Sequence, residues 1–126
     1  MPEPDSREFM VGPLRLAVEY RRTLEDEGPS VRVFGVVGGQ ERQVLRFDCF
    51  SVDPHYHYDP DGRNELHHMR DEGIEDSTEW TLHRIERSLS EMIRRAGFGS
   101  LADQVVPEQV AEHLAGIRDS LPVPVA

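Results

Sequence analysis

The sequence contains a single cysteine, Cys49, and no long hydrophobic run. One cysteine cannot form a disulfide within the chain, which fits a reducing compartment. The first residues, Met-Pro-Glu-Pro-Asp, have neither the basic segment nor the apolar run of a secretory signal or transit peptide, and no window approaches the length of a membrane span. We therefore expect a cytoplasmic protein that has no membrane segment.

Basic charge is also scarce, with 14 basic residues against 24 acidic ones and a formal net charge of -10. Such a chain repels a phosphate backbone unless its basic residues gather on one face, and here they are interleaved with glutamates. We expect no nucleic-acid partner. The sequence has no nucleophile elbow and no phosphate-loop pattern, so it offers no nucleotide cofactor motif and leaves open whether the protein is an enzyme.

Length and composition predict one folded domain. A chain of 126 residues with 37% hydrophobic residues can bury one two-layer core. Residues 1–12 are rich in proline and acidic groups, and we expect a flexible N-terminal tail there. Residues 13–121 are expected to form a single α+β domain. Residues 122–126 contain two prolines and are expected to form a C-terminal tail.

Alternating hydrophobicity predicts several strands, and a change to a period of three and four residues at Ser77 predicts helices. The expected elements are strands at 14–23, 31–37, 43–52, 55–59 and 63–69, a helix at 77–96 and a shorter helix at 107–120. Because the strand connections are short, we expect an antiparallel β-meander of four to five strands packed against the long C-terminal helix, with the short helix beside it. The sheet edges and open face that remain favour a homodimer.

Four of the six histidines lie between Asp53 and Arg70, in a stretch that is typical of a β-hairpin. The turn Asp59-Pro60-Asp61-Gly62 has proline at its second position and glycine at its fourth, which favours a type I turn followed by a glycine bulge. In that register His57 lies opposite Glu65 and His55 lies opposite His67, so all four share one face of the sheet.

These four side chains form a candidate metal site at His55, His57, Glu65 and His67. Alternate residues on a strand are about 6.6 Å apart and facing Cβ atoms about 5 Å apart, so imidazoles and a carboxylate can converge on one ion. The donor set suits one transition metal, such as zinc, iron, manganese, nickel or copper. Two other interpretations stay open: histidines that serve as acid-base or anion-binding groups, and a polar face with only a structural role.

A second hairpin register is also compatible with the sequence. A two-residue Asp61-Gly62 loop would group His55 and His57 with Asp59 and His68 instead. In either register Tyr56 and Tyr58 point to the opposite face, where we expect them to pack against the long helix.

Three aspartates near the hairpin could orient the imidazoles. For Asp53 and Asp59 the simpler interpretation is strand-end and turn chemistry, whereas the role of Asp48 is open. Cys49 shares a face with Leu45 and Phe47, which favours a small buried side chain over a nucleophile.

The segments Phe47-Asp-Cys-Phe50, Pro54-His-Tyr-His-Tyr58 and His67-His68 resemble an uncharacterised family of small bacterial proteins over roughly residues 14–96. This resemblance implies no activity. The plan of successive strands, a tyrosine- and histidine-rich hairpin and a closing helix is also weakly similar to the TumE-like toxins of two-gene toxin-antitoxin pairs. That similarity implies a protein partner and a non-enzymatic interaction or regulatory role as the alternative to a metal site.

Overall fold

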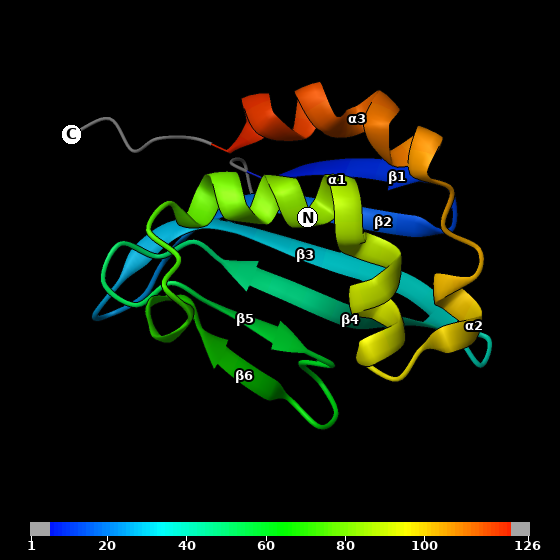
Figure 1. Ribbon diagram of the computed structural model, residues 1–126, viewed down its shortest axis with the longest axis horizontal. Helices are drawn as coiled ribbons and strands as arrows, with labels where there is room; N and C mark the ends of the chain where they lie inside the picture. Colours follow the sequence, from blue (N-terminus) through cyan, green and yellow to red (C-terminus); the bar gives the residue numbers. More distant parts are fainter. Residues whose placement is uncertain (1–5, 122–126) are drawn as a thin grey trace.

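The computed structural model describes residues 6–121 and shows a single antiparallel sheet of six strands with helices on one face (Figure 1). The strands follow one another in the order β1-β2-β3-β4-β5-β6, so each one pairs with its neighbour in sequence. Their bounds are β1 (Arg7–Val11), β2 (Leu14–Arg22), β3 (Glu27–Val37), β4 (Gln40–Asp48), β5 (His55–Tyr58) and β6 (Glu65–His68). Because every connection between strands is short, the antiparallel meander needs no crossover.

The helical elements all follow the last strand in sequence. They are the 3-10 helix η1 (Met69–Glu72) and the α-helices α1 (Ser77–Arg95), α2 (Gly99–Ala102) and α3 (Pro107–Ser120). Helix α1 begins where the Asp76 side chain accepts a hydrogen bond from the backbone N–H of Glu79, which satisfies one of the unpaired donors of the first turn. Helix α3 begins with Pro107, a residue whose fixed φ suits the first helical position.

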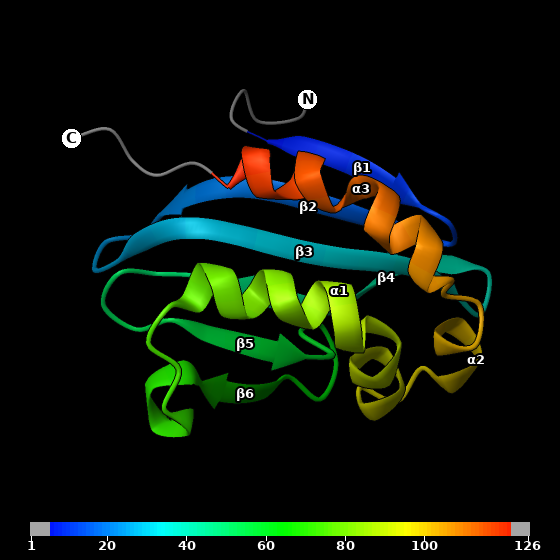
Figure 2. The same cartoon turned by 45° about the horizontal axis from the view of Figure 1, so that its top comes forward.

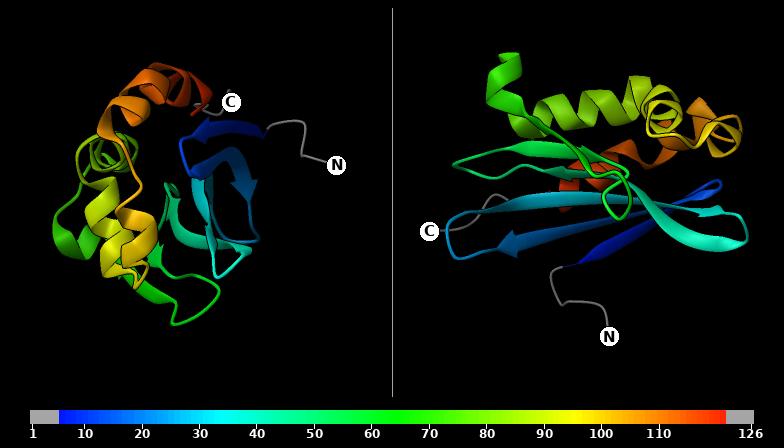
Figure 3. Two further views of the ribbon diagram at one scale, coloured as in Figure 1. Left: turned by 90° about the vertical axis from the view of Figure 1, so that its right-hand side faces the viewer. Right: turned by 90° about the horizontal axis from the view of Figure 1, so that it is seen from below.

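Helices α1 and α3 lie side by side across one face of the sheet, which curves around them (Figures 2 and 3). Alternate residues of the strands, such as Leu16, Val33 and Phe47, are fully buried on this face. They belong to one hydrophobic core with the apolar stripe of α1, including Ile85 and Ile93. The 3.6-residue period of the helix and the two-residue period of the strands therefore meet in a single core.

The expected sheet of four to five strands with one long and one short helix is wrong in its count, although the chain is α+β overall. The sheet has six strands. The described residues form three α-helices, and α1 has 19 residues, α2 has four and α3 has 14. The added strand is β1, which lies inside the stretch expected to be a tail. Composition does not reveal this strand, because its evidence is the pairing with β2. Val11 pairs with Leu14 across a two-residue turn in which Gly12 has a φ of 58°.

The expectations for the remaining ends of the chain, at residues 1–5 and 122–126, lie outside the described residues. Within residues 6–121, the helices are too short or too polar to cross a membrane.

The second face of the sheet carries charged and polar side chains. Arg15 of β2, Arg32 of β3 and Arg46 of β4 lie on it, each half-buried. Because side chains alternate along a strand, Asp48 at the end of β4 and His55 at the start of β5 lie on this same face. The open face therefore holds both Asp48 and His55.

Candidate metal centre

The hairpin of β5 and β6 has the second of the two registers considered from the sequence. His55 pairs with His68 and His57 pairs with Leu66, so the register that placed His57 opposite Glu65 is wrong. The backbone N–H of Asn64 donates to the carbonyl of Asp59 at 2.7 Å, and positive φ angles occur at Asp59 and Asn64. The turn is therefore wider than a type I turn with a glycine bulge.

The Asp59 side chain explains this turn. Its carboxylate accepts hydrogen bonds from the Arg42 guanidinium at 2.6 Å and from the backbone N–H of Arg63 at 2.9 Å. Burial opposes ionisation of Asp59, but these two bonds lower its pKa. Asp59 is thus tied to β4 and to its own turn and is not among the metal-competent groups that lie close together.

Glu65 and His67, two of the four residues first expected at the site, lie on the helix-covered side of β6. The ring of His67 stacks on Tyr56, with centroids 5.1 Å apart. Glu65 accepts hydrogen bonds from His67 and from Arg95 of α1. The structure therefore separates Glu65 and His67 from His55 and His57, whose side chains point to the open face.

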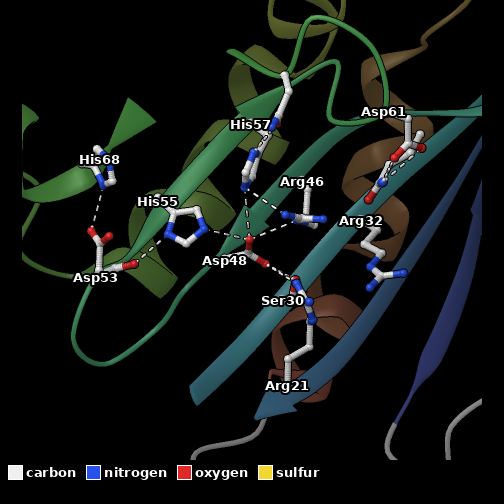
Figure 4. Close-up of polar contacts among 12 residues, drawn as sticks. Arg21, Ser30, Arg32, Arg46, Asp48, Asp53, His55, His57, Asp61 and His68 are labelled. Carbon is white, nitrogen blue, oxygen red and sulfur yellow. Dashed lines mark hydrogen bonds and ion pairs between the residues drawn. The ribbon is translucent and has the colours of Figure 1, made fainter. Parts of the chain in front are cut away.

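His55 and His57 instead converge on Asp48, from the neighbouring strand β4 (Figure 4). Asp48 lies directly opposite His55 in the β4–β5 ladder. Its Oδ2 atom is 3.1 Å from Nε2 of His55 and 3.4 Å from Nε2 of His57. One ligand atom from each of the three residues lies within 4.8 Å of the other two, which is close enough for a single ion to be shared.

The opposite ring nitrogens of both histidines are held by oxygen atoms. Nδ1 of His55 lies 2.7 Å from the backbone carbonyl of Asp53, and Nδ1 of His57 lies 2.6 Å from Oδ1 of Asn64. Since these oxygens accept hydrogen bonds, each Nδ1 can donate its hydrogen to one of them, and each Nε2 is directed toward Asp48, where it can carry a proton or bind a metal. Metal-binding histidines are held in the same way, with the second nitrogen fixed by a neighbouring oxygen.

Asp48 is fully buried, and its carboxylate has donors on both oxygens. Oδ1 accepts from the Ser30 hydroxyl at 2.6 Å and from Arg21 at 3.3 Å, while Oδ2 accepts from Nε of Arg46 at 3.0 Å. Burial by itself would favour the neutral acid, but hydrogen bonds from His55, His57 and Ser30 hold the pKa of Asp48 well below its ordinary value. The carboxylate is therefore ionised across the physiological range.

His55 has acceptors at both ring nitrogens, the Asp53 carbonyl and the Asp48 carboxylate. Burial opposes its protonation, but these two partners outweigh burial and raise the pKa of His55. A proton on Nε2, or a metal cation in its place, satisfies the same geometry, because both put positive charge between the imidazole and Oδ2.

Arg46 is the internal competitor for such a cation. Its Nη2 atom lies 3.0 Å from Nε2 of His57, and its Nε atom lies 3.0 Å from Oδ2 of Asp48. The guanidinium thus occupies the space between two of the three candidate ligands. Binding of an ion there requires Arg46 to turn outward, toward solvent that its side chain already partly contacts.

His68 is connected to this cluster through Asp53. Its Nδ1 atom lies 2.9 Å from the Asp53 carboxylate, and the backbone carbonyl of the same aspartate holds His55. The centroids of the His55 and His68 rings are 6.1 Å apart. His68 therefore borders the cluster without belonging to it.

A family model described as a domain of unknown function (DUF7700) matches residues 8–121. The chain belongs to this family. No curated protein and no solved structure matches it. The match begins at the second residue of β1 and continues through α3, so the Asp48, His55 and His57 cluster lies inside the DUF7700 domain.

Sequence reasoning placed His55 and His57 at the site but gave Asp48 only an open supporting role. The hairpin turn suggested partners on β6, whereas the carboxylate comes from β4. The spacing Asp48-x6-His55-x-His57 is the available signal, because a strand end and a strand start joined by six residues lie opposite each other in an antiparallel pair.

Proposed function

We propose that this DUF7700 protein binds one divalent transition metal through Asp48, His55 and His57. The observation that carries the proposal is the convergence of two Nε2 atoms on one carboxylate oxygen while both Nδ1 atoms are held by oxygens. Histidines with only a structural role on a polar surface need not direct both of their Nε2 atoms at one carboxylate oxygen.

The donor set narrows the choice of ion. Two imidazoles and one carboxylate suit zinc, iron, manganese, nickel or copper better than calcium or magnesium, which prefer oxygen ligands. Three protein ligands leave at least one coordination position free, as in metal sites that bind water or a substrate, whereas structural zinc sites are closed by four. We therefore favour an open site over a structural one.

Metal uptake by variants tests the proposal. Purified protein is stripped with a chelator, incubated with zinc or iron(II), desalted and analysed for metal by mass spectrometry. We expect about one ion per chain in the wild type and none in His57→Ala. His67→Ala is the matched control, since His67 lies on the same hairpin but on the opposite face, and it should retain uptake.

A thermal melt adds an independent readout. A ligand that binds only the folded state at about 100 times its dissociation constant raises the free energy of unfolding by about 2.7 kcal/mol. The wild type and His67→Ala should both show this rise with metal, and His57→Ala should not. Equal metal uptake by the wild type and by His57→Ala contradicts the proposal. So does a lack of uptake both by the wild type and by Arg46→Gln, in which the competing guanidinium is removed.

The broader expectations from sequence remain proposals. They are a bacterial, cytoplasmic origin, a homodimer, and a protein partner of the kind that the weak similarity to TumE-like toxins implies. The edge strand β6, which carries the exposed Leu66, offers unpaired backbone groups to a second chain. Size-exclusion chromatography with light scattering distinguishes a monomer from a dimer.

A further inference from the structure

Two arginines share a single carboxylate on the open face. Within residues 6–121, Asp48 is the one acidic side chain that pairs with Arg21 or with Arg46, at 3.3 Å and 3.0 Å. The Asp48 side chain is 0% exposed, whereas those of Arg21 and Arg46 are 29% and 22% exposed. The carboxylate is therefore enclosed, and both guanidinium groups border solvent.

The neighbouring charges do not neutralise this pair. Arg32, the next arginine on the face, pairs with Glu19 at 3.1 Å. Asp53 pairs with His68. The surplus positive charge therefore stays at Arg21 and Arg46, although the whole protein has a formal net charge of -10.

A bound metal enlarges this surplus. Once a divalent ion takes Oδ2 of Asp48, Nε of Arg46 loses the acceptor that it has in the metal-free protein. Two guanidinium groups and a divalent ion then face one carboxylate. Uncompensated charges in a partly buried site are costly, so an anion is attracted to the open coordination position.

The arginine side chains at this site favour an oxyanion as the ligand. All 14 basic residues of this chain are arginines, and the planar guanidinium binds carboxylate and phosphate groups through two parallel hydrogen bonds. Arg21 also lies over the Phe50 ring, 5.9 Å from its centroid, and the same ring makes a T-shaped contact with His55, with centroids 5.5 Å apart. Phe50 thus gives the site an apolar wall next to its positive charges.

We infer that the metal-loaded protein binds a small oxyanion, a carboxylate or a phosphate, with one oxygen on the metal and the others on Arg21 and Arg46. This inference rests on the proposed metal site and names the class of ligand for its open position. The anion replaces Oδ2 of Asp48 as the acceptor for Arg46 and gives Arg21 a second acceptor beside Oδ1.

Cobalt(II)-loaded protein makes the test direct, because the visible spectrum of cobalt reports a change in its ligands. Inorganic phosphate and acetate are titrated separately, and the metal content of each sample is measured so that affinities are compared at equal occupancy. For Arg21→Gln we expect at least one of the two anions to bind more weakly than to the wild type, by about tenfold or more, since the variant removes a charged hydrogen-bond donor. Arg22→Gln is the control, because the Arg22 side chain is 73% exposed and forms an ion pair with Glu27 instead of Asp48.

The possible results of this titration distinguish the proposed metal site from the inferred oxyanion binding. Binding of phosphate alone or of acetate alone, weakened in Arg21→Gln, supports the inference and identifies the oxyanion. Uptake of cobalt with no spectral response to either anion, or with equal affinities in wild type and Arg21→Gln, overturns the inference and leaves the metal site standing. Failure to take up cobalt overturns both.

Discussion

Replacing Asp48 by asparagine tests how strongly the buried carboxylate holds the open face together. Asparagine keeps the shape of the side chain but removes the charge. Three partners of the carboxylate are affected, namely Arg21, Arg46 and His55. A hydrogen bond to a charged group contributes about 1.5–3 kcal/mol and a neutral one about 1 kcal/mol, so each partner loses about 1 kcal/mol. The expected loss in the free energy of unfolding is about 3 kcal/mol.

Urea denaturation of metal-free protein measures this loss. With a slope of about 1.5 kcal/mol per molar urea, the midpoint of Asp48→Asn should fall by about 2 M. Asp53→Asn is the control, because its side chain is half exposed and pairs with His68 at the surface, where ion pairs contribute about 0–1 kcal/mol. If Asp48→Asn lost less than about 1 kcal/mol, the carboxylate would not organise the cluster and the reasoning would be refuted.

Two further predictions concern the β4–β5 connection, residues 49–54. A Cβ atom on Gly28 would lie 2.2 Å from the carbonyl oxygen of Cys49, so Gly28→Ala should displace this connection and lower the free energy of unfolding by about 2 kcal/mol in a urea melt. Burial opposes ionisation of Asp26, but hydrogen bonds from backbone N–H groups, that of Val52 among them, lower its pKa. The stabilisation is thus complete above the unfolded pKa of about 3.9 and is lost as the pH falls through the lower folded value. Asp26→Asn should cost about 1 kcal/mol at pH 7 and less at pH 3; an equal cost at both pH values would contradict this assignment.

Much of the sheet could be predicted from hydrophobic alternation. Leu14, Leu16 and Val18 alternate with Arg15, Ala17 and Glu19 in β2, and the structure buries all three under the helices. The strand that was missed, β1, has only five residues in a segment dominated by proline and acidic groups. Strand β1 is held in an extended conformation by its hydrogen-bonded pairing with β2, which its own short sequence does not indicate.

The hairpin register could not be settled from local turn rules. Those rules consider only residues 59–62, whereas Arg42, 17 positions earlier, donates to the Asp59 carboxylate and helps set the turn. A shift of one residue in register moves every side chain of β6 to the other face. In the register that the structure has, His68 and not His67 lies on the same face as His55.

The candidate site is made by the strand pair β4–β5. Within residues 6–121, this is the pair in which a carboxylate lies opposite a histidine and contacts its Nε2 atom. On the other flank of β5, His57 faces Leu66, which offers no donor atom. On the β4 flank, Asp48 faces His55, and its position at the strand end also brings Ser30 of β3 and Arg21 of β2 within reach. The carboxylate is thus fixed from three strands before any ion arrives, which lowers the cost of organising the ligands when one binds.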